Sequence, residues 1–583
     1  MSFSKHILAT VIGFFVAFLV FFFVVIIFSA LAGSGEQVTV HKNSVLVLDS
    51  SKKIADYTPK DNGPFKGLNL SETLGLDAVL DAIANAKSDG KIKGISIESG
   101  FAAGLAQTQE IRKALLDFKT SGKFITAYSD AYSQKMYYLA SVADTIFLNP
   151  NGAIDFKGLG AEMLYYKDFE DKYGIKANVI REGKYKSFGE PYIKNHMSDA
   201  NRTQLKVLLG SIWTEISTEI TASRNISAAN LDSIANSLGG RKATLALANG
   251  LIDKTAYLDE YEASLHNALS ISEKKKIKKI SLNDYIKVSK RSSSSKNKIA
   301  VIYAQGEIKY GAGDATYIGQ DRMIKDIRKA VKDKKVKAIV LRVNSPGGSA
   351  LASDLIWREL VLAKKKKPLI VSMGNYAASG GYYISCMADE IFAEPTTITG
   401  SIGVFGILPT FKSLLDEQGI KAEQVKTHEF AIGYSPYKEL EEKYASIVQE
   451  GVSDIYLQFK SRVAKGRNIS IDSVETIAQG RVWSGRDAIK NGLVDKLGSL
   501  DDALAAAAEK AAITSYKIVK YPKITKDLKA ILAEFKKSPF GLSKEALVKE
   551  KLGTKAANLL KSTEKILREE GLQTRLPYDL EIQ

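Results

Sequence analysis

Ser379 is the residue of this chain whose surroundings best suit a nucleophile. It follows an apolar run at 368–371 and a short stretch of small residues, and Gly380 comes directly after it. A serine at such a strand-to-helix turn can expose its hydroxyl, and the N–H of Gly380 can then donate to a developing oxyanion. The motif differs from the G-x-S-x-G elbow because position 377 is alanine. The sequence therefore predicts a nucleophilic serine of another class.

A second glycine-rich loop could complete the oxyanion site. Residues 344–349 read Asn-Ser-Pro-Gly-Gly-Ser and follow an apolar strand that we expect to end at Val343. The backbone N–H groups of Gly348 and Gly380 would hold the oxyanion, and Gly347 would let the chain approach closely. Any tight turn can use a Pro-Gly-Gly sequence, so this loop gains meaning only beside Ser379.

A serine hydroxyl needs a base to take its proton. The five histidines belong to no partner motif; they are His6, His41, His196, His266 and His428. A lysine can be the base if its amine is neutral, which requires its pKa to fall from about 10.4 to roughly 7–8. Burial without a carboxylate partner can lower the pKa of a lysine that far. We expect no metal or cofactor, because there is no H-E-x-x-H motif and Cys386 is the single cysteine.

The chain contains an internal repeat. Residues that follow the predicted nucleophile match residues 245 positions earlier. Tyr382-Tyr383, Ala388-Asp389, Ile391-Phe392 and Pro395 match Tyr137-Tyr138, Ala143-Asp144, Ile146-Phe147 and Pro150. Further ordered matches extend to 250–254 and 492–496. Chance does not account for so many ordered matches, so the chain carries two copies of one domain.

The two copies differ at the residues that could do chemistry. At the same offset, Ser379 corresponds to Gln134. At the nearby offset of 244, the double glycine of 344–349 has no equivalent in 100–105. In the other direction, Lys186 corresponds to Ala431. Each copy keeps what the other lacks, which predicts one site shared between two halves, with Ser379 as nucleophile and Lys186 as base.

The repeat also sets the expected domains. They are a first copy at 36–290, a linker at 291–298, a second copy at 299–515 and a lysine-rich tail at 516–583, which we expect to be a solvated appendage or to cover an edge. Short apolar strands alternate with helical stretches in each copy, which indicates an α/β fold with largely parallel strands.

Residues 1–35 form an expected membrane anchor. No charged residue occurs from Ile7 to Ala32, which is longer than the roughly 20 residues that a spanning helix needs. The apolar part of a cleaved signal peptide is shorter, although Ala30-Leu31-Ala32 could be a cleavage site. Lys5 before the run favours a cytoplasmic N-terminus with both copies outside. The net charge of +17 is spread along the chain without a nucleic-acid motif, which favours an anionic membrane surface over nucleic acid.

Four motifs together make the chain similar to the signal peptide peptidase A family in its long tandem-repeat form, also called protease IV or family S49. The motifs are 344–349, 378–383, Thr399-Gly400-Ser401-Ile402-Gly403 and Gly183-Lys184-Tyr185-Lys186-Ser187. The resemblance covers nearly everything from the anchor to about residue 515. It departs at Phe188-Gly189, where small aliphatic residues are expected, and this bears on pocket shape.

The resemblance implies two tandem ClpP/crotonase-like domains and a membrane-bound serine peptidase with a Ser/Lys dyad. By position, Ser379 matches the family's nucleophile, Lys186 its general base, Ser401 a serine that orients the lysine, and Gly348 and Gly380 the oxyanion hole. The implied substrates are hydrophobic peptides, chiefly cleaved signal peptides. The implied setting is a homotetramer on the outer side of a bacterial inner membrane.

Two alternatives from other classes remain open. A crotonase-type acyl-CoA enzyme would use the same glycine loops, but it needs a carboxylate base for which there is no motif. A catalytically dead membrane scaffold is the other alternative, and the intact dyad argues against it.

Overall fold

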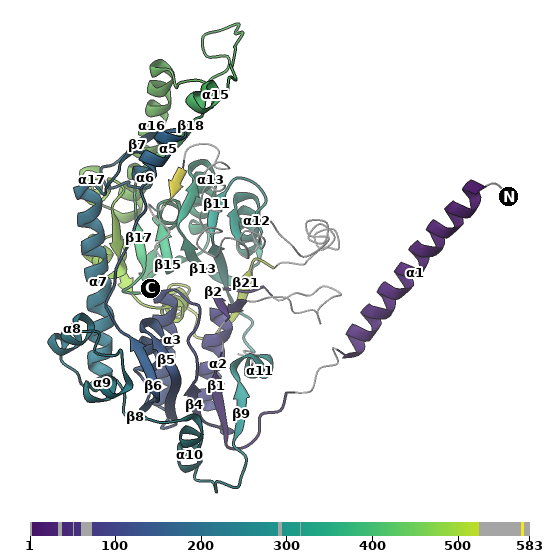
Figure 1. Ribbon diagram of the computed structural model, residues 1–583, viewed down its shortest axis with the longest axis vertical. Coiled ribbons are helices and arrows are strands. Elements are labelled where there is room, and N and C mark those ends of the chain that lie inside the picture. Colours follow the sequence, from purple (N-terminus) through teal and green to yellow (C-terminus); the bar gives the residue numbers. More distant parts are fainter. Residues whose placement is uncertain are drawn as a thin grey trace.

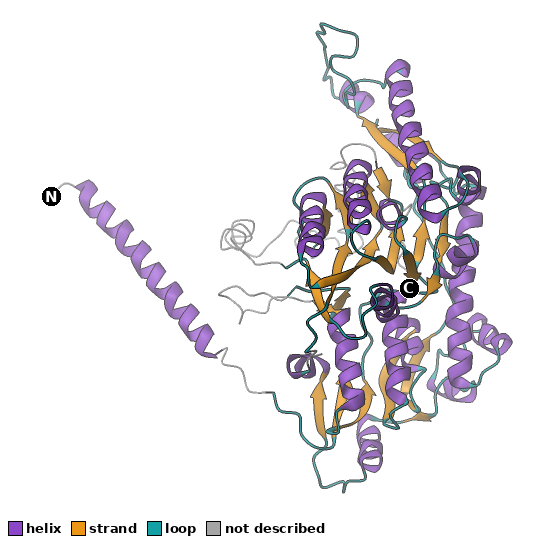
Figure 2. Ribbon diagram, turned by 180° about the vertical axis from the view of Figure 1, so that it is seen from behind, coloured by secondary structure: helices purple, strands orange, loops and turns teal. Residues whose placement is uncertain are grey.

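The computed structural model describes residues 3–32, 38–49, 52–59, 73–289, 294–314, 316–523 and 573–575. Strands and helices alternate through most of this length, as the sequence predicts. Two large sheets lie one beyond the other along the molecule with helices over their faces (Figures 1 and 2). The fold is therefore α/β, while the ClpP/crotonase-like assignment of each copy stays a prediction.

The first sheet is built from the first copy. All its pairings are parallel. Its order is β8 (Lys254–Thr255), β6 (Thr145–Asp155), β5 (Phe124–Ser133), β4 (Ile92–Ile97), β1 (Ser44–Leu48) and β9 (Lys278–Ser281). The strand β1 is buried along its whole length, because helices cover a parallel sheet on both sides.

The second sheet belongs to the second copy and has the same plan. Its main path is β19 (Val482–Ser484), β17 (Ile398–Gly400), β15 (Leu369–Ala378), β13 (Val336–Ser345), β10 (Lys298–Gln305) and β21 (Lys517–Tyr521), with β16 (Glu390–Ala393) and β20 (Lys496–Leu497) beside it. The strand β21 lies beyond residue 515 and pairs in parallel with β10, so this sheet reaches further than the domain boundary expected from the repeat.

Matching helices show the repeat in three dimensions. They are α2 (Leu76–Ser88) with α12 (Gln320–Lys332), α3 (Leu105–Lys119) with α13 (Ala350–Lys364), α4 (Gln134–Ala140) with α14 (Gly380–Ser385), α7 (Asp199–Arg224) with α16 (Glu442–Arg467), and α8 (Ala228–Asn236) with α17 (Ile471–Ile477). The long pair α7 and α16 ends alike, at Asn225 and Asn468 in the left-handed conformation. Asparagine tolerates this conformation and so ends both helices.

Eight further helices follow the N-terminal segment in the part of the chain that the structure describes. They are α5 (Lys167–Lys172), α6 (Glu190–Ile193), α9 (Ala243–Ala248), α10 (Leu258–Leu269), α11 (Leu282–Val288), α15 (Lys412–Glu417), α18 (Gly485–Lys490) and α19 (Leu500–Lys510). A two-stranded sheet joins β2 (Lys53–Ala55) to β3 (Thr73–Gly75).

A third sheet contains strands from both copies. Its order is β12 (Tyr317–Gly319), β11 (Glu307–Lys309), β14 (Gly347–Ser349), β22 (Gln573–Arg575), β18 (Val404–Thr410) and β7 (Lys176–Glu182). Here β7 of the first copy pairs antiparallel with β18 of the second. The expected tail thus contributes a strand, β22, to the interior of a sheet.

The two apolar cores also share residues. Ala378, Ile398 and Val482 of the second copy pack in the core of the first, and Ile180 of the first packs in the core of the second. Burial of apolar surface therefore stabilises the two copies as one unit.

The expected N-terminal anchor forms one helix, α1 (Phe3–Ala32), which is drawn apart from the sheets in Figure 1. Over the part of the chain that the structure describes, no helix has both the length and the apolarity to cross a membrane. The helical part of the prediction is therefore confirmed, whereas the membrane span is not.

Candidate active site

The predicted base, Lys186, follows β7, which pairs with β18 of the second copy. The last pair of this ladder joins Glu182 to Val404. The chain then turns at Gly183, whose φ is +100° and where an added Cβ would lie 2.4 Å from the backbone of Gln479. The N–H of Tyr185 donates to the Gln479 carbonyl at 2.9 Å. These contacts hold Lys186, which lies four residues past the ladder, against the turn at Gln479 and Gly480 of the second copy.

The predicted nucleophile lies where β15 ends and α14 begins. Ser379 has φ +56° and ψ −117°, a conformation that a non-glycine residue adopts only under local strain of about 1–3 kcal/mol. Its N–H donates to the carbonyl of Gly400 at 2.8 Å, which fixes the turn against the neighbouring strand. Its hydroxyl does not cap α14, although Ser379 occupies the cap position. The strained turn therefore directs the hydroxyl away from the helix.

The two predicted catalytic residues meet in the interior. Lys186 Nζ lies 2.9 Å from Ser379 Oγ. It also lies 3.0 Å from Ser401 Oγ and 3.2 Å from the Ser401 carbonyl oxygen. All three residues have a relative exposure of 0%. The structure thus brings together Ser379, Lys186 and Ser401, as the sequence predicts, and adds the Ser401 carbonyl, which the sequence did not signal.

Burial controls the protonation of the lysine. It lowers the pKa of Lys186 well below its ordinary value, because charge is disfavoured away from water. The ring of Phe405 lies 5.8 Å from Nζ, and Phe188 packs on that ring at 4.7 Å, so the departure from the family pattern contributes to the apolar wall. A neutral amine has two N–H donors and one lone pair. The two Ser401 oxygens can accept from the donors, which leaves the lone pair for the proton of Ser379.

The turn at Gln479 and Gly480 packs closely against Lys186. Gly480 has φ +78°, and an added Cβ would lie 2.6 Å from the Cβ of Lys186. Gln479 itself has φ +53°. The sequence predicts no role for this turn, and a Gln-Gly pair is its only sequence signal.

The predicted oxyanion glycines stand on adjoining elements. Gly380 opens α14, which contacts β14, the strand that contains Gly348. Gly348 has φ +149°, and an added Cβ would lie 2.0 Å from the carbonyl oxygen of Ile308, so this position accepts only glycine. Gly347 has φ +101°. Their role as oxyanion donors stays a prediction.

In the first copy, the position equivalent to Ser379 is occupied by Gln134, whose side chain is an amide. Gln134 Oε1 accepts from the N–H groups of Lys157 and Gly158 at 3.0 and 2.9 Å, and its Nε2 donates to the Gly158 carbonyl at 2.9 Å. The side chain is locked to backbone and offers no nucleophile. In the second copy, Ala431 and the competing His428 are exposed in a loop. Of these two equivalent positions, only the one in the second copy therefore offers a nucleophile.

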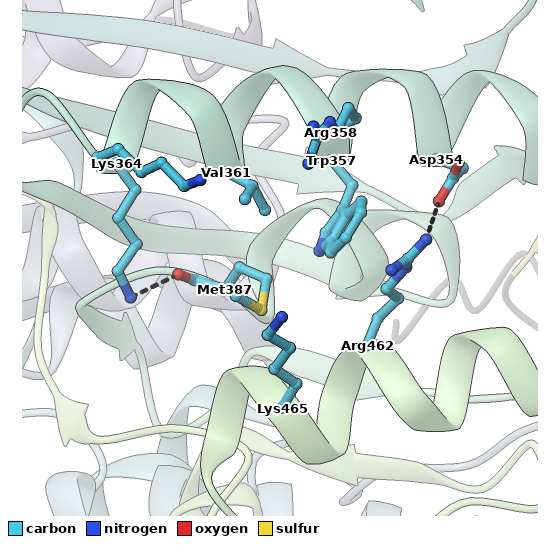
Figure 3. A pocket seen from close by; sticks show the side chains of 9 residues that line it. Asp354, Trp357, Arg358, Val361, Lys364, Met387, Arg462 and Lys465 are labelled. Carbon is cyan, nitrogen blue, oxygen red and sulfur yellow. Dashed lines mark hydrogen bonds and ion pairs between the residues drawn. The ribbon is translucent and has the colours of Figure 1, made fainter.

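A separate cavity of about 590 Å³ lies between α13 and α16 (Figure 3). Arg462 stacks on the ring of Trp357 at 3.8 Å and pairs with Asp354, and Lys364 donates to the Met387 carbonyl at 2.9 Å. Its lining includes none of the dyad residues. The cavity is thus distinct from the candidate active site.

Comparison with known proteins agrees with the geometry. The model of peptidase family S49 matches residues 117–272 and 362–514. The chain belongs to peptidase family S49. Protease 4 of Salmonella typhi is 38% identical over 510 residues, 84% of this chain and 82% of that protein. Protease 4 of Haemophilus influenzae is 38% identical over 444 residues, 74% and 72% of the two chains.

A shorter relative aligns as well. The putative signal peptide peptidase SppA of Enterococcus faecium is 38% identical over 196 residues, which is 33% of this chain and 57% of that protein. Family membership, which the sequence motifs predicted, is confirmed, and with it the class of serine-type protease.

Proposed function

We propose that this S49 protein is an endopeptidase whose active site is a Ser379/Lys186 dyad shared between the two copies. The observation that carries the proposal is the contact of 2.9 Å between Lys186 Nζ and Ser379 Oγ. A general base must come within about 2.6–3.2 Å of the group whose proton it takes, and this pair meets that condition.

The chemistry follows from the geometry. The lone pair of neutral Lys186 takes the proton of Ser379, and Oγ attacks the carbonyl carbon of the scissile peptide bond. The N–H groups of Gly348 and Gly380 donate to the resulting oxyanion. Protonated Lys186 then gives its proton to the leaving amine, and the C–N bond breaks. A water molecule, deprotonated by Lys186, hydrolyses the acyl ester and restores the serine.

Ser401 has a positioning role in this scheme. Its hydroxyl and carbonyl oxygens hold the two N–H bonds of the amine, so the lone pair faces Ser379 Oγ. The positive φ of Ser401, +50°, turns its own carbonyl toward the amine. The proposed order of importance is therefore Ser379 and Lys186 first, and Ser401 second.

The proposed substrates are hydrophobic peptides, chiefly cleaved signal peptides. Support comes from the motifs shared with signal peptide peptidase A and from the apolar wall formed by Phe188 and Phe405. An anchor at 1–35, a place outside the cytoplasm and a homotetramer belong to the same proposal. The anchor is supported by the uncharged run from Ile7 to Ala32 and by the exposure of its described large apolar side chains, such as Phe14 at 79%.

A serine-directed fluorophosphonate probe tests the proposed function against its rivals. The expected result is covalent labelling at Ser379, found by peptide mapping, and loss of labelling in Ser379→Ala. A folded protein that stays unlabelled would favour a crotonase-type enzyme or a dead scaffold.

A further inference from the structure

The cavity between α13 and α16 is strongly positive (Figure 3). Its volume of about 590 Å³ lies within the range of small-molecule sites, roughly 300–1,000 Å³. Of the described residues that line it, Asp354 carries the one carboxylate, and five carry cationic side chains: Arg358, Lys364, Lys365, Arg462 and Lys465. Such a lining favours an anionic occupant.

The lining residues form one face of each helix. Along α13 and its end they occur at 354, 357, 358, 361, 364 and 365, which is the three-and-four spacing of a single helix face. On α16, Arg462 and Lys465 are three residues apart. The two basic faces are turned toward each other across the cavity (Figure 3). Their like charges repel, and an anion between them would relieve that repulsion.

Two of the five cations already have a carboxylate partner. Arg462 Nη2 lies 3.6 Å from Asp354 Oδ1, and Lys364 Nζ lies 3.2 Å from Asp389 Oδ1. The other three make no ion pair with a carboxylate in the described part of the chain, and all three are exposed; they are Arg358, Lys365 and Lys465. Their positive charge is free to act on a ligand.

A buried donor faces the same space. Trp357 lines the cavity and is only 5% exposed, and its Nε1 has no hydrogen-bond partner among the described residues. Figure 3 shows the indole nitrogen on the ring edge nearer to Met387 and Lys465. An indole N–H can only donate, and a buried donor without an acceptor destabilises the fold. An anionic oxygen in the cavity would accept from it.

The ends of the two helices explain only part of this charge. Lys364 and Lys465 lie in the last turns of α13 and α16, where the helix dipole favours cations. Arg358 and Arg462 lie more than one turn before those ends, beyond the reach of this effect. The dipole also leaves the N–H of Trp357 without an acceptor. A ligand accounts for these three residues together.

We propose that the cavity between α13 and α16 binds a phosphate group, carried by a lipid headgroup or by a small soluble molecule. A phosphate offers more acceptor oxygens than a carboxylate does, which suits a lining of guanidinium, ammonium and indole donors. The apolar side chains of Val361 and Met387 would contact the part of the molecule that carries the phosphate. The site is separate from the Ser379/Lys186 dyad, so this inference does not depend on the proposed chemistry.

Calorimetric titration of the full-length protein with inorganic phosphate tests the site at constant ionic strength. Trp357→Phe removes the buried donor but keeps an aromatic ring, and Lys465→Met removes one of the unpaired charges. Each should weaken phosphate binding by about tenfold, which is the effect of losing one hydrogen bond to a charged group. Thermal midpoints measured without phosphate show whether the variants fold.

Two neighbouring lysines supply a matched control. Lys365 lines the cavity and Lys366 does not, although both are exposed. Lys365→Met should weaken binding by about tenfold, and Lys366→Met by less than about twofold, because both remove the same charge but only one removes a contact. Equal weakening by the two variants would overturn the inference. So would the lack of saturable binding at about 10 mM phosphate, which would fill most of a millimolar site.

Short-chain phospholipids distinguish the two sources of phosphate. If dihexanoyl phosphatidylglycerol displaces inorganic phosphate and zwitterionic dihexanoyl phosphatidylcholine does not, the ligand is an anionic lipid headgroup. If neither displaces it, the ligand is a small soluble phosphate compound. Either result supports a phosphate site, provided that Lys365→Met weakens the binding and Lys366→Met does not. Displacement that is the same in both lysine variants would contradict the proposed place of binding.

Discussion

Lys186 Nζ lies 2.9 Å from Ser379 Oγ, although 193 residues separate them along the chain. One residue comes from the first copy of the repeat and the other from the second. The antiparallel ladder of β7 and β18 brings the two copies together beside both residues.

Loss of either dyad residue should abolish peptide hydrolysis. Ser379→Ala removes the nucleophile and Lys186→Met removes the base, so each should lower kcat/KM by a factor on the order of 10⁴ or more. The double variant should be no worse than either single variant, because the residues act as a unit. Kinetics on a fluorogenic peptide measure the effect.

Lys184→Met is the matched control, since Lys184 is exposed two residues from the base. It should retain full activity. Substantial hydrolysis by Lys186→Met would show that another base acts, and His428→Ala would then identify or exclude that histidine.

Activity should rise with pH through the depressed pKa of Lys186. Burial lowers this pKa, and only the neutral amine can accept the serine proton, so kcat/KM should increase as the amine loses its own proton. A pH profile of kcat/KM measures the acid limb. A flat profile from pH 5 to 9 would contradict lysine as the base.

The stability of the folded protein should also depend on pH through Lys186. Between the depressed folded pKa and about 10.4, the unfolded chain binds a proton at Lys186 that the folded chain lacks. The stability of the unaltered protein therefore rises with pH through this window, and Lys186→Met should be the more stable protein at its lower end. Urea unfolding across a pH series compares them.

Ser401→Ala should weaken activity less than loss of a dyad residue. It removes one acceptor at 3.0 Å from the amine, but the Ser401 carbonyl at 3.2 Å remains. We expect a fall in kcat of about 10–100-fold with KM little changed. A loss as large as that of Lys186→Met would make Ser401 a full participant in proton transfer.

Each half of the chain alone should be inactive. Residues 36–290 contain Lys186 but have Gln134 at the nucleophile position, and residues 299–583 contain Ser379 but have Ala431 at the lysine position. Co-expressed halves should associate and recover part of the activity, as gel filtration and peptide hydrolysis would show. Near-full activity in the second half alone would place the base within it.

A buried ionic cluster should be essential to the pairing of the copies. Arg342 Nε lies 3.1 Å from Asp56 Oδ2, and its Nη2 contacts Glu110 Oε1. All three side chains are at most 2% exposed. Arg342→Met would leave two buried carboxylates unpaired and should destabilise the protein by about 3–5 kcal/mol.

Chemical unfolding measures this loss, with Lys443→Met as the control. Lys443 pairs with Glu429 at the surface, and its removal should leave the unfolding midpoint unchanged. An unchanged midpoint in Arg342→Met would show that the cluster does not hold the copies together.

The sequence by itself predicted that two copies share one site. The repeat and its two complementary losses, Gln134 for Ser379 and Ala431 for Lys186, needed no coordinates, because aligned copies expose what each has lost. The alternation of strands and helices likewise predicted the α/β layers, since short apolar strands can be recognised from the local sequence alone.

The tertiary structure decided what depends on pairing between distant strands. The β7–β18 ladder, the Ser401 carbonyl beside the lysine and the buried Arg342 cluster arise from contacts across the two copies, which no local pattern encodes. The place of β22 shows the limit most clearly. The sequence predicted that the tail is a solvated appendage or covers an edge. The strand β21 does lie at the edge of the second sheet, whereas β22 pairs on both sides inside the third, because backbone N–H and C=O groups can pair without a distinctive side-chain pattern.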